Sequence, residues 1–234
     1  MSSIAIWTRD WAKAKNINNV YWQETDSTNT QAKQMQMASQ FLLFLAEHQT
    51  SGRGRNDRRW SDAGEGHCLL SSWTFKLNTP PQPIAAPLVG LMLYESAALT
   101  WPTQHWSLKA PNDLFLNDKK VAGLLVETVS QGNEHRWVVG LGMNVMSHPG
   151  IERSGCLSEI MEVNQLAWSD FLDRFFEGLT DIREEIAKNS LGEDRRLQLI
   201  AALNRFPLLA ERYTDIYEDG SLATTTQTIR WSDL

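Results

Sequence analysis

Residues 41–60 of the chain read FLLFLAEHQTSGRGRNDRRW. The apolar run Phe41–Ala46 is too short for a helix and predicts a buried strand. The polar stretch after it holds one aspartate against four arginines, namely Arg53, Arg55, Arg58 and Arg59. Glycine lets backbone N–H groups approach an anion, and guanidinium groups bind phosphate or carboxylate in a bidentate manner. We therefore expect a strand that leads into a loop able to close over an anionic ligand. A plain solvated basic loop fits the pattern about as well.

Apolar runs separated by polar turns continue on both sides of this stretch. Residues 26–29, Asp-Ser-Thr-Asn, are of the types that cap a helix N-terminus. We expect strands at Val20–Thr25, Phe41–Ala46, Cys68–Leu77, Trp106–Lys109, Leu114–Leu116, Val121–Val129 and Trp137–Val145, the last two forming a hairpin. We expect helices at Asn29–Ser39, Ile84–Leu99, Phe171–Ile186 and Leu197–Phe206, and a tail hairpin at Asp219-Gly220.

The composition disfavours several classes of protein. The 234 residues are 42% hydrophobic and 21% charged, with a net charge of −6, which is a globular balance. Proteins that bind duplex DNA or a membrane surface are usually basic, so we expect neither. Cys68 and Cys156 are far apart and fit a reducing compartment better than a disulfide framework or a cysteine zinc site. Because no apolar run approaches the roughly 18 residues that span a bilayer, and no signal-peptide core is present, we expect a cytoplasmic protein.

Two further motifs contain residue types suited to anions and nucleobases. In Lys109-Ala110-Pro111-Asn112-Asp113, the lysine stands at a strand end, and the following carboxylate could hold Mg²⁺. In Gly140-Leu141-Gly142-Met143-Asn144, the small residues suggest close approach of a ligand, and the Asn144 amide can pair with a nucleobase edge. Taken alone, the first motif also fits a plain turn and the second a tightly packed strand.

In this order, the segments resemble biotin–protein ligases, the biotin–[acetyl-CoA-carboxylase] ligase family. The resemblance runs from about residue 20 to residue 146. It is carried by five ordered motifs: Asp26-Ser27-Thr28-Asn29, Gln49 with Gly52-Arg53-Gly54-Arg55 and Trp60, Lys109-x-Pro111-Asn112-Asp113, Lys120-Val121-Ala122-Gly123 with Glu127, and Gly140-x-Gly142-x-Asn144.

The resemblance implies an α/β fold of the α+β type. This fold is a mixed β-sheet flanked by helices, like that of class II aminoacyl-tRNA synthetases, with a small C-terminal appendage. It implies an ATP-dependent, AMP-forming ligase that converts biotin to biotinyl-5′-AMP and transfers biotin to a lysine of a biotin carboxyl carrier protein. That carrier would belong to acetyl-CoA carboxylase or a related carboxylase. ATP with Mg²⁺ and biotin would be substrates, with no tightly bound prosthetic group.

The resemblance also implies roles for individual residues. Biotin would be bound by Ser27, Thr28, Asn29, Gln49, Gly52, Arg53, Gly54, Arg55, Lys109 and Gly123. ATP and the adenylate would be bound by Arg53, Arg55, Arg58, Trp60, Lys109 and Asn144. Lys109 and Arg55 would be catalytic, with Lys109 bridging the biotin carboxylate and the α-phosphate. Asp113, as a metal ligand, and Lys120 are carried over as well.

The chain departs from the family pattern at several places. Asn56-Asp57-Arg58 stands where the family often has a glycine, which could stiffen the loop or weaken retention of the intermediate. Ala110 replaces a tryptophan, which could change the acyl specificity. We expect a catalytic domain over residues 1–188 and a reduced C-terminal domain over 189–234. About twenty residues precede the match, so we expect no DNA-binding domain. A homodimer is left open.

Two other functions remain open at this point. A lipoate or octanoate ligase of the same superfamily is the nearest rival enzyme, and the Gly-Arg-Gly-Arg loop argues against it. A non-catalytic biotin-binding module is the rival from another class. Such a module would be stabilised against heat by biotin but would release no pyrophosphate.

Overall fold

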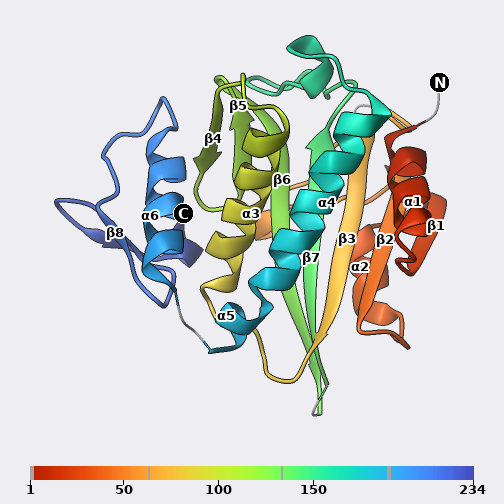
Figure 1. Cartoon of the computed structure of the whole chain (residues 1–234), viewed down its shortest axis with the longest axis horizontal. Coiled ribbons are helices and arrows are strands. Elements are labelled where there is room, and N and C mark those ends of the chain that lie inside the picture. The colour runs from red at the N-terminus through yellow and green to blue at the C-terminus, as the bar shows by residue number, and fades with distance from the viewer. Residues whose placement is uncertain (1–2, 63, 133, 189–190) are drawn as a thin grey trace. The chain divides into compact units, whose positions relative to one another are not determined.

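A computed structural model describes residues 3–62, 64–132, 134–188 and 191–234 (Figure 1). The chain forms two compact units. One comprises the chain up to Pro80 together with Lys120–Ser169, and the other comprises Pro81–Lys119 together with Asp170–Leu234. The predicted boundary between residues 188 and 189 meets residues outside the described ones, so the division into two sequence domains stays a prediction.

The first unit contains a mixed sheet of five strands. Its strands are β1 (Asn19–Thr25), β2 (Phe41–Gln49), β3 (Cys68–Leu77), β6 (Lys119–Gln131) and β7 (Glu134–Asn144). The order is β1-β2-β3-β7-β6, in which only the β1–β2 pair is parallel. The predicted strands are confirmed, although β1, β2, β6 and β7 differ from the predicted bounds by one to three residues at one or both ends. The expected fold class, a mixed sheet flanked by helices, is also confirmed.

Two helices of the first unit cover opposite faces of this sheet. Helix α1 (Ile4–Ala14) packs on β2 and β3, with the Trp11 and Trp73 ring centroids 5.8 Å apart. Helix α2 (Thr28–Gln34) packs on β2, β3 and β7, where Ala32, Phe44 and Val138 form a buried cluster. Because successive strand residues point to opposite faces, a sheet covered on both sides needs nearly continuous apolar runs. This explains why eight consecutive residues of β3 are buried.

The two helices also mark where the sequence prediction was wrong. Helix α1 was not predicted at all, although Ser3 caps it by accepting the Ile6 N–H at 3.0 Å. Helix α2 was predicted to reach Ser39 but ends at Gln34, because Met35 is extended at φ −74° and ψ 135°. The buried Arg136 guanidinium donates to the Met35 carbonyl at 2.6 Å and holds that end. A long-range contact thus ends a helix that local propensity would continue.

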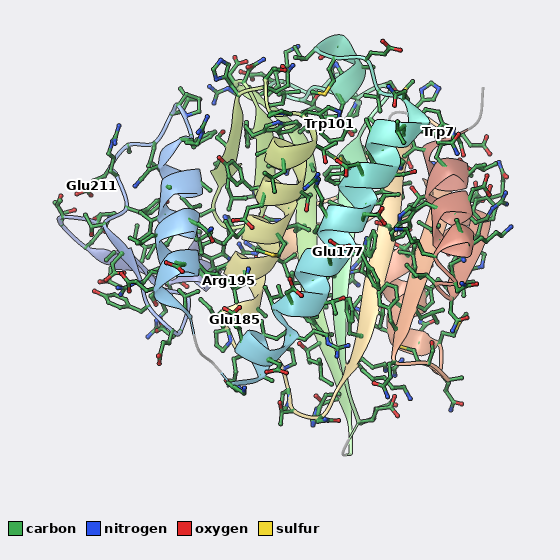
Figure 2. The ribbon with its side chains drawn as sticks, viewed as in Figure 1. Trp7, Trp101, Glu177, Glu185, Arg195 and Glu211 are labelled. Atoms are coloured by element: carbon green, nitrogen blue, oxygen red, sulfur yellow. The ribbon has the colours of Figure 1, made fainter. Side chains whose placement is uncertain are left out.

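The second unit is mostly helical. Its helices are α3 (Ala85–Thr100), the part of α4 (Gln165–Asp181) from Asp170, α5 (Arg183–Lys188) and α6 (Glu193–Asn204). Strands β4 (Trp106–Lys109) and β5 (Asp113–Leu116) form an antiparallel hairpin. The predicted helix Phe171–Ile186 is in fact two helices, broken at a turn at Ile182. Figure 2 labels Glu185 and Arg195, whose ion pair of 2.6 Å joins α5 to α6.

The tail contains a small sheet of strands β8 (Asp215–Ile216), β9 (Leu222–Ala223) and β10 (Thr228–Ile229), in the order β10-β9-β8. The predicted turn at Asp219-Gly220 is confirmed, with Gly220 at φ +80°. Short 3₁₀ helices lie at η1 (Arg55–Asp57), η2 (Leu157–Glu159) and η3 (Trp231–Asp233). In the part of the chain that the structure describes, no helix has the length and apolar character needed to cross a membrane.

Candidate active site

The parallel pairing of β1 with β2 brings the two motif-bearing loops together. Thr25 and Gln49 are partners at the ends of these strands. The next residues keep the loops in contact, since Thr50 N–H donates to the Thr25 carbonyl and Ser51 N–H to the Asp26 carbonyl, each at 2.9 Å. Both loops therefore leave the sheet at the same edge.

A row of buried polar side chains lies at the start of α2. Ser27, Thr28 and Asn29 are each less than 5% exposed. Gln49 Oε1 accepts the Thr28 N–H at 2.7 Å, and Ser72 Oγ donates to Thr28 Oγ1 at 2.8 Å. Such a row offers hydrogen-bond donors and acceptors without a net charge, which suits a neutral polar group.

The Glu127 carboxylate on β6 joins three donor side chains of the site. Its carboxylate accepts hydrogen bonds from Asn29 Nδ2 at 2.9 Å, Lys33 Nζ at 2.7 Å and Arg53 Nη2 at 3.0 Å. Burial raises the pKa of Glu127, but the hydrogen bonds from Lys33 and Asn29 and the charges of Lys33 and Arg53 lower it below its ordinary value. Glu127 belongs to a quoted motif, yet sequence reasoning gave it no role.

The glycine- and arginine-rich loop is a narrow hairpin. Trp60 N–H donates to the Gly52 carbonyl at 3.0 Å, and Gly54 N–H donates to the Arg58 carbonyl at 2.7 Å. A Cβ at Gly52 would lie 2.6 Å from the Trp60 carbonyl oxygen, so this close approach requires glycine. At the tip, Asn56 takes the left-handed conformation, with φ 53° and ψ 43°, which asparagine tolerates better than most residues.

The base of the loop is closed by a residue that sequence reasoning missed. The Asp62 carboxylate lies 2.9 Å from His48 Nδ1 and accepts the Gln49 N–H at 3.2 Å. Gln49 in turn holds Thr28. Nothing in the spacing of Asp62 within the sequence distinguishes it from an ordinary loop carboxylate.

The Trp60 side chain, at the end of the loop, packs against the sheet. Gly123 and Gly142 are cross-strand partners on β6 and β7. A Cβ at Gly142 would lie 2.5 Å from Trp60 Cε2, and one at Gly123 would lie 3.0 Å from Trp60 Cζ3. The indole thus rests in a space that exists because both strands carry glycine there. Its Nε1–H is buried and has no acceptor among the described residues.

Lys120 lies beside Trp60, and the predicted nucleotide residue Asn144 follows Gly142 on the same strand. Lys120 Nζ is 5.7 Å from the indole ring centroid, within reach of a cation–π contact. Asn144 is buried at the end of β7, where its Nδ2 donates to the Gly155 carbonyl at 3.1 Å. The Cys68 thiol approaches Asn144 Oδ1 at 3.6 Å.

The structure brings most predicted site residues together in the first unit. These are Ser27, Thr28, Asn29, Gln49, Gly52, Arg53, Gly54, Arg55, Arg58, Trp60, Gly123 and Asn144. Lys109 and Asp113 belong to the second unit, where they are cross-strand partners at the end of the β4–β5 hairpin. Lys109 is exposed there, and its Nζ lies 5.8 Å from the Phe206 ring centroid. Among the described residues, no group of three or more His, Cys, Asp or Glu side chains could hold a metal ion.

The site therefore combines a buried neutral polar row with a cationic loop and an aromatic side chain. Such a combination can bind a ligand that has a neutral polar end and an anionic end. The glycines on β6 and β7 leave room for a flat group against the sheet.

Comparison with known proteins agrees with this geometry. Residues 21–144, just over half of the chain, match the model of the biotin/lipoate A/B protein ligase family. The biotin–[acetyl-CoA-carboxylase] ligase of Paracoccus denitrificans is 35% identical over 133 residues, covering 53% of each chain. That of Mycobacterium tuberculosis is 32% identical over 112 residues, covering 46% of this chain and 41% of the relative. The chain thus spans about half the length of these relatives, or less.

A solved structure shows the same fold. The biotin protein ligase of Aquifex aeolicus, in complex with biotin and ATP, superimposes with a TM-score of 0.69 at 24% identity. The match covers 92% of this chain and 97% of that one. Because the family model covers the motifs that build the site, the chain belongs to the biotin/lipoate A/B protein ligase family.

Proposed function

We propose that the chain is an ATP-dependent biotin–protein ligase. It would form biotinyl-5′-AMP and transfer biotin to a lysine of the carrier domain of acetyl-CoA carboxylase or a related carboxylase. The observation that carries this proposal is the arrangement of the first unit. There the buried row of Ser27–Asn29 and Gln49 lies beside a cationic loop whose Trp60 rests on glycines. Both relatives described above carry the name of a biotin ligase.

The buried polar row fits the ureido ring of biotin. This ring is neutral and has two N–H donors and one carbonyl acceptor, so it needs partners of both kinds. The Ser27 side chain forms no capping bond to its own helix, and Gln49 Oε1 is oriented by Thr28. A neutral ring costs less to bury against such a row than a charged group would.

The activation step concentrates negative charge. The biotin carboxylate oxygen attacks the α-phosphorus of ATP, the bond from that phosphorus to the bridging oxygen breaks, and pyrophosphate leaves with the electron pair. Arg53, Arg55 and Arg58 lie on one short loop, where preorganised cations stabilise this charge. The resemblance gives Lys109 the bridging role between the carboxylate and the α-phosphate. Mg²⁺ would arrive as part of the ATP substrate, with Asp113 the carboxylate that the resemblance assigns to it.

The transfer step needs protection from water. The lysine amine of the carrier attacks the acyl carbon of the mixed anhydride and AMP leaves, but water attacks the same carbon. The loop would reduce this loss by covering the adenylate. Trp60 and Asn144 would hold the adenine through stacking and hydrogen bonding, and the unpaired Trp60 Nε1–H offers one further donor.

Intact mass spectrometry tests the proposal directly. A biotin-carrier domain is incubated with the protein, MgATP and either biotin or lipoate. We expect one biotin-sized mass gain, confined to a single lysine and absent with lipoate. A gain with lipoate alone would indicate a lipoate ligase, which the family also contains. Biotin binding without pyrophosphate release would indicate a binding module.

A further inference from the structure

A histidine side chain crosses the loop between β7 and η2. His148 Nδ1 lies 2.8 Å from Ser154 Oγ and accepts the Gly150 N–H at 3.2 Å. On the other side of the ring, His148 Nε2 lies 3.0 Å from Glu159 Oε1. One imidazole thus ties together three points of a segment that forms neither strand nor α-helix.

Both ring nitrogens of His148 have polar partners. Nδ1 faces the Gly150 N–H and the Ser154 hydroxyl, and Nε2 faces the Glu159 carboxylate. A serine–histidine–glutamate row of this kind resembles a hydrolytic triad. Two contacts argue for a structural role instead, because the Gly150 N–H faces Nδ1 and Ser154 Oγ donates to the Ile151 carbonyl.

The clamped segment contacts Asn144, which is predicted to bind the nucleotide, and Lys120, which lies beside the predicted nucleotide residue Trp60. Lys120 N–H donates to the Arg153 carbonyl at 2.7 Å, and Gly155 N–H donates to the Lys120 carbonyl at 3.0 Å. The Gly155 carbonyl accepts from Asn144 Nδ2 at 3.1 Å. Residues 153–155 therefore hold both the backbone of Lys120 and the side chain of Asn144.

Residues 153–155 keep their conformation through contacts with other residues of the same loop. Arg153 is in the left-handed region at φ +63°, which a long side chain rarely adopts. The residue next to it, Ser154, is the one that contacts the imidazole. The His148 ring is largely shielded, with 22% of its side chain exposed. The ring links the start of the segment to Ser154 and Glu159, and Ser158 Oγ adds a second link by donating to the Met146 carbonyl at 2.9 Å.

We propose that His148 is a positioning residue for the nucleotide half of the site. It acts through residues 153–155 on Lys120 and Asn144 and touches no reacting atom. This inference rests on the proposed function. It predicts that loss of the imidazole weakens the use of ATP while leaving the use of biotin nearly unchanged, because the buried polar row lies on other elements.

The test compares His148→Ala with the wild type and a matched control. We expect the KM for ATP in pyrophosphate release to rise about tenfold, with the KM for biotin within about twofold. His148→Asn should recover part of the loss, because its Oδ1 can accept the Gly150 N–H. The control is His135→Ala, which removes a similar 2.9 Å contact between His135 and Ser130 from the β6–β7 hairpin. A rise in both KM values, or the same rise in the control, overturns the proposal.

A second readout does not depend on activity. Hydrogen exchange at the backbone amides of Lys120 and Gly155 should become at least about tenfold faster in His148→Ala, while amides of β3 stay protected. Unchanged exchange at both amides overturns the positioning role even if turnover falls. A wild-type protein that releases no pyrophosphate overturns the proposed function. The exchange data would then decide alone whether His148 holds this segment.

Discussion

Replacing Gly142 with alanine would place a methyl group where the indole of Trp60 lies. The new Cβ would be 2.5 Å from Cε2, 2.8 Å from Cζ2 and 2.9 Å from Cδ2. Ordinary contacts begin at 3.4 Å, so the ring must move away by about 0.9 Å. Three atoms of one rigid ring are involved, and a rotamer change at a flexible tip cannot relieve the overlap. The same substitution at Gly123 needs only about 0.4 Å, since its nearest indole atom is at 3.0 Å.

These displacements set the expected loss of stability. Overpacking of this kind costs about 1–3 kcal/mol, and the reduced freedom of the unfolded chain returns about 0.4–1 kcal/mol. We expect Gly142→Ala to lower the free energy of unfolding by about 1.5 kcal/mol and Gly123→Ala by about 0.5 kcal/mol. For a chain of this size, the larger value lowers Tm by roughly 3–6 °C. Urea unfolding followed by circular dichroism measures both.

A double-mutant cycle decides whether Trp60 is the cause. In a Trp60→Ala background the methyl group meets no ring, so the Gly142→Ala penalty should shrink by about 1 kcal/mol or more. An equal penalty in both backgrounds would refute the reasoning, because strand conformation rather than the indole would then demand glycine. A second cycle that pairs Gly123→Ala with Trp60→Ala should give a smaller coupling energy than the cycle with Gly142→Ala.

Three further predictions concern charged side chains of the proposed site. Lys109→Ala should abolish pyrophosphate release and leave the circular dichroism spectrum unchanged, and a folded variant with near-normal rate would remove Lys109 from the chemistry. Arg55→Ala should still bind biotin by calorimetry but release biotinyl-AMP faster, and unchanged release would contradict a covering role for the loop. The pKa of Glu127 is lowered in the folded chain, against the effect of burial, by Lys33 and Asn29 and by the charge of Arg53. Its contribution to stability is therefore present above its unfolded pKa and is lost as the pH falls through the lowered value. Glu127→Gln should be less stable at neutral pH and should lose less stability between about pH 5 and pH 3. Urea midpoints of the wild type and Glu127→Gln, measured from pH 5 to pH 3, test this prediction. If both proteins lose the same stability over this range, the Glu127 carboxylate does not stabilise the fold.

The sequence was most informative where burial alone sets the pattern. The continuous apolar run Phe41–Ala46 predicted β2, because a strand covered on both faces is apolar at nearly every position. The sequence was least informative at helix ends. Helix α2 ends where Arg136, about a hundred residues later, donates to the Met35 carbonyl. Helix α1 begins at the capping Ser3, whose Oγ also donates to Glu47 on β2 at 2.5 Å. No local pattern contains either partner.

The candidate site was likewise predicted only in part from the sequence. The motifs predicted which residues matter, since loop glycines and arginines have a chemistry that can be stated from residue type. They could not predict the supporting contacts. Asp62 closes the loop through His48 and Gln49, and Glu127 joins Asn29 to Arg53. Asp62 is an ordinary loop carboxylate in the sequence, and Glu127 belongs to a quoted motif but had no predicted role; the fold gives both their contacts.

The glycines of β7 show which parts of the site strand periodicity can predict. Residues two apart in a strand share a face, so Gly140, Gly142 and Asn144 must lie on one side of the sheet. That much follows from the sequence. What fills the space above each glycine does not, because Asn29 lies against Gly140 and Trp60 against Gly142. Both come from segments more than eighty residues earlier, delivered to this face by the parallel pairing of β1 with β2. The glycine pattern therefore marks where a site lies, and the topology determines which side chains build it.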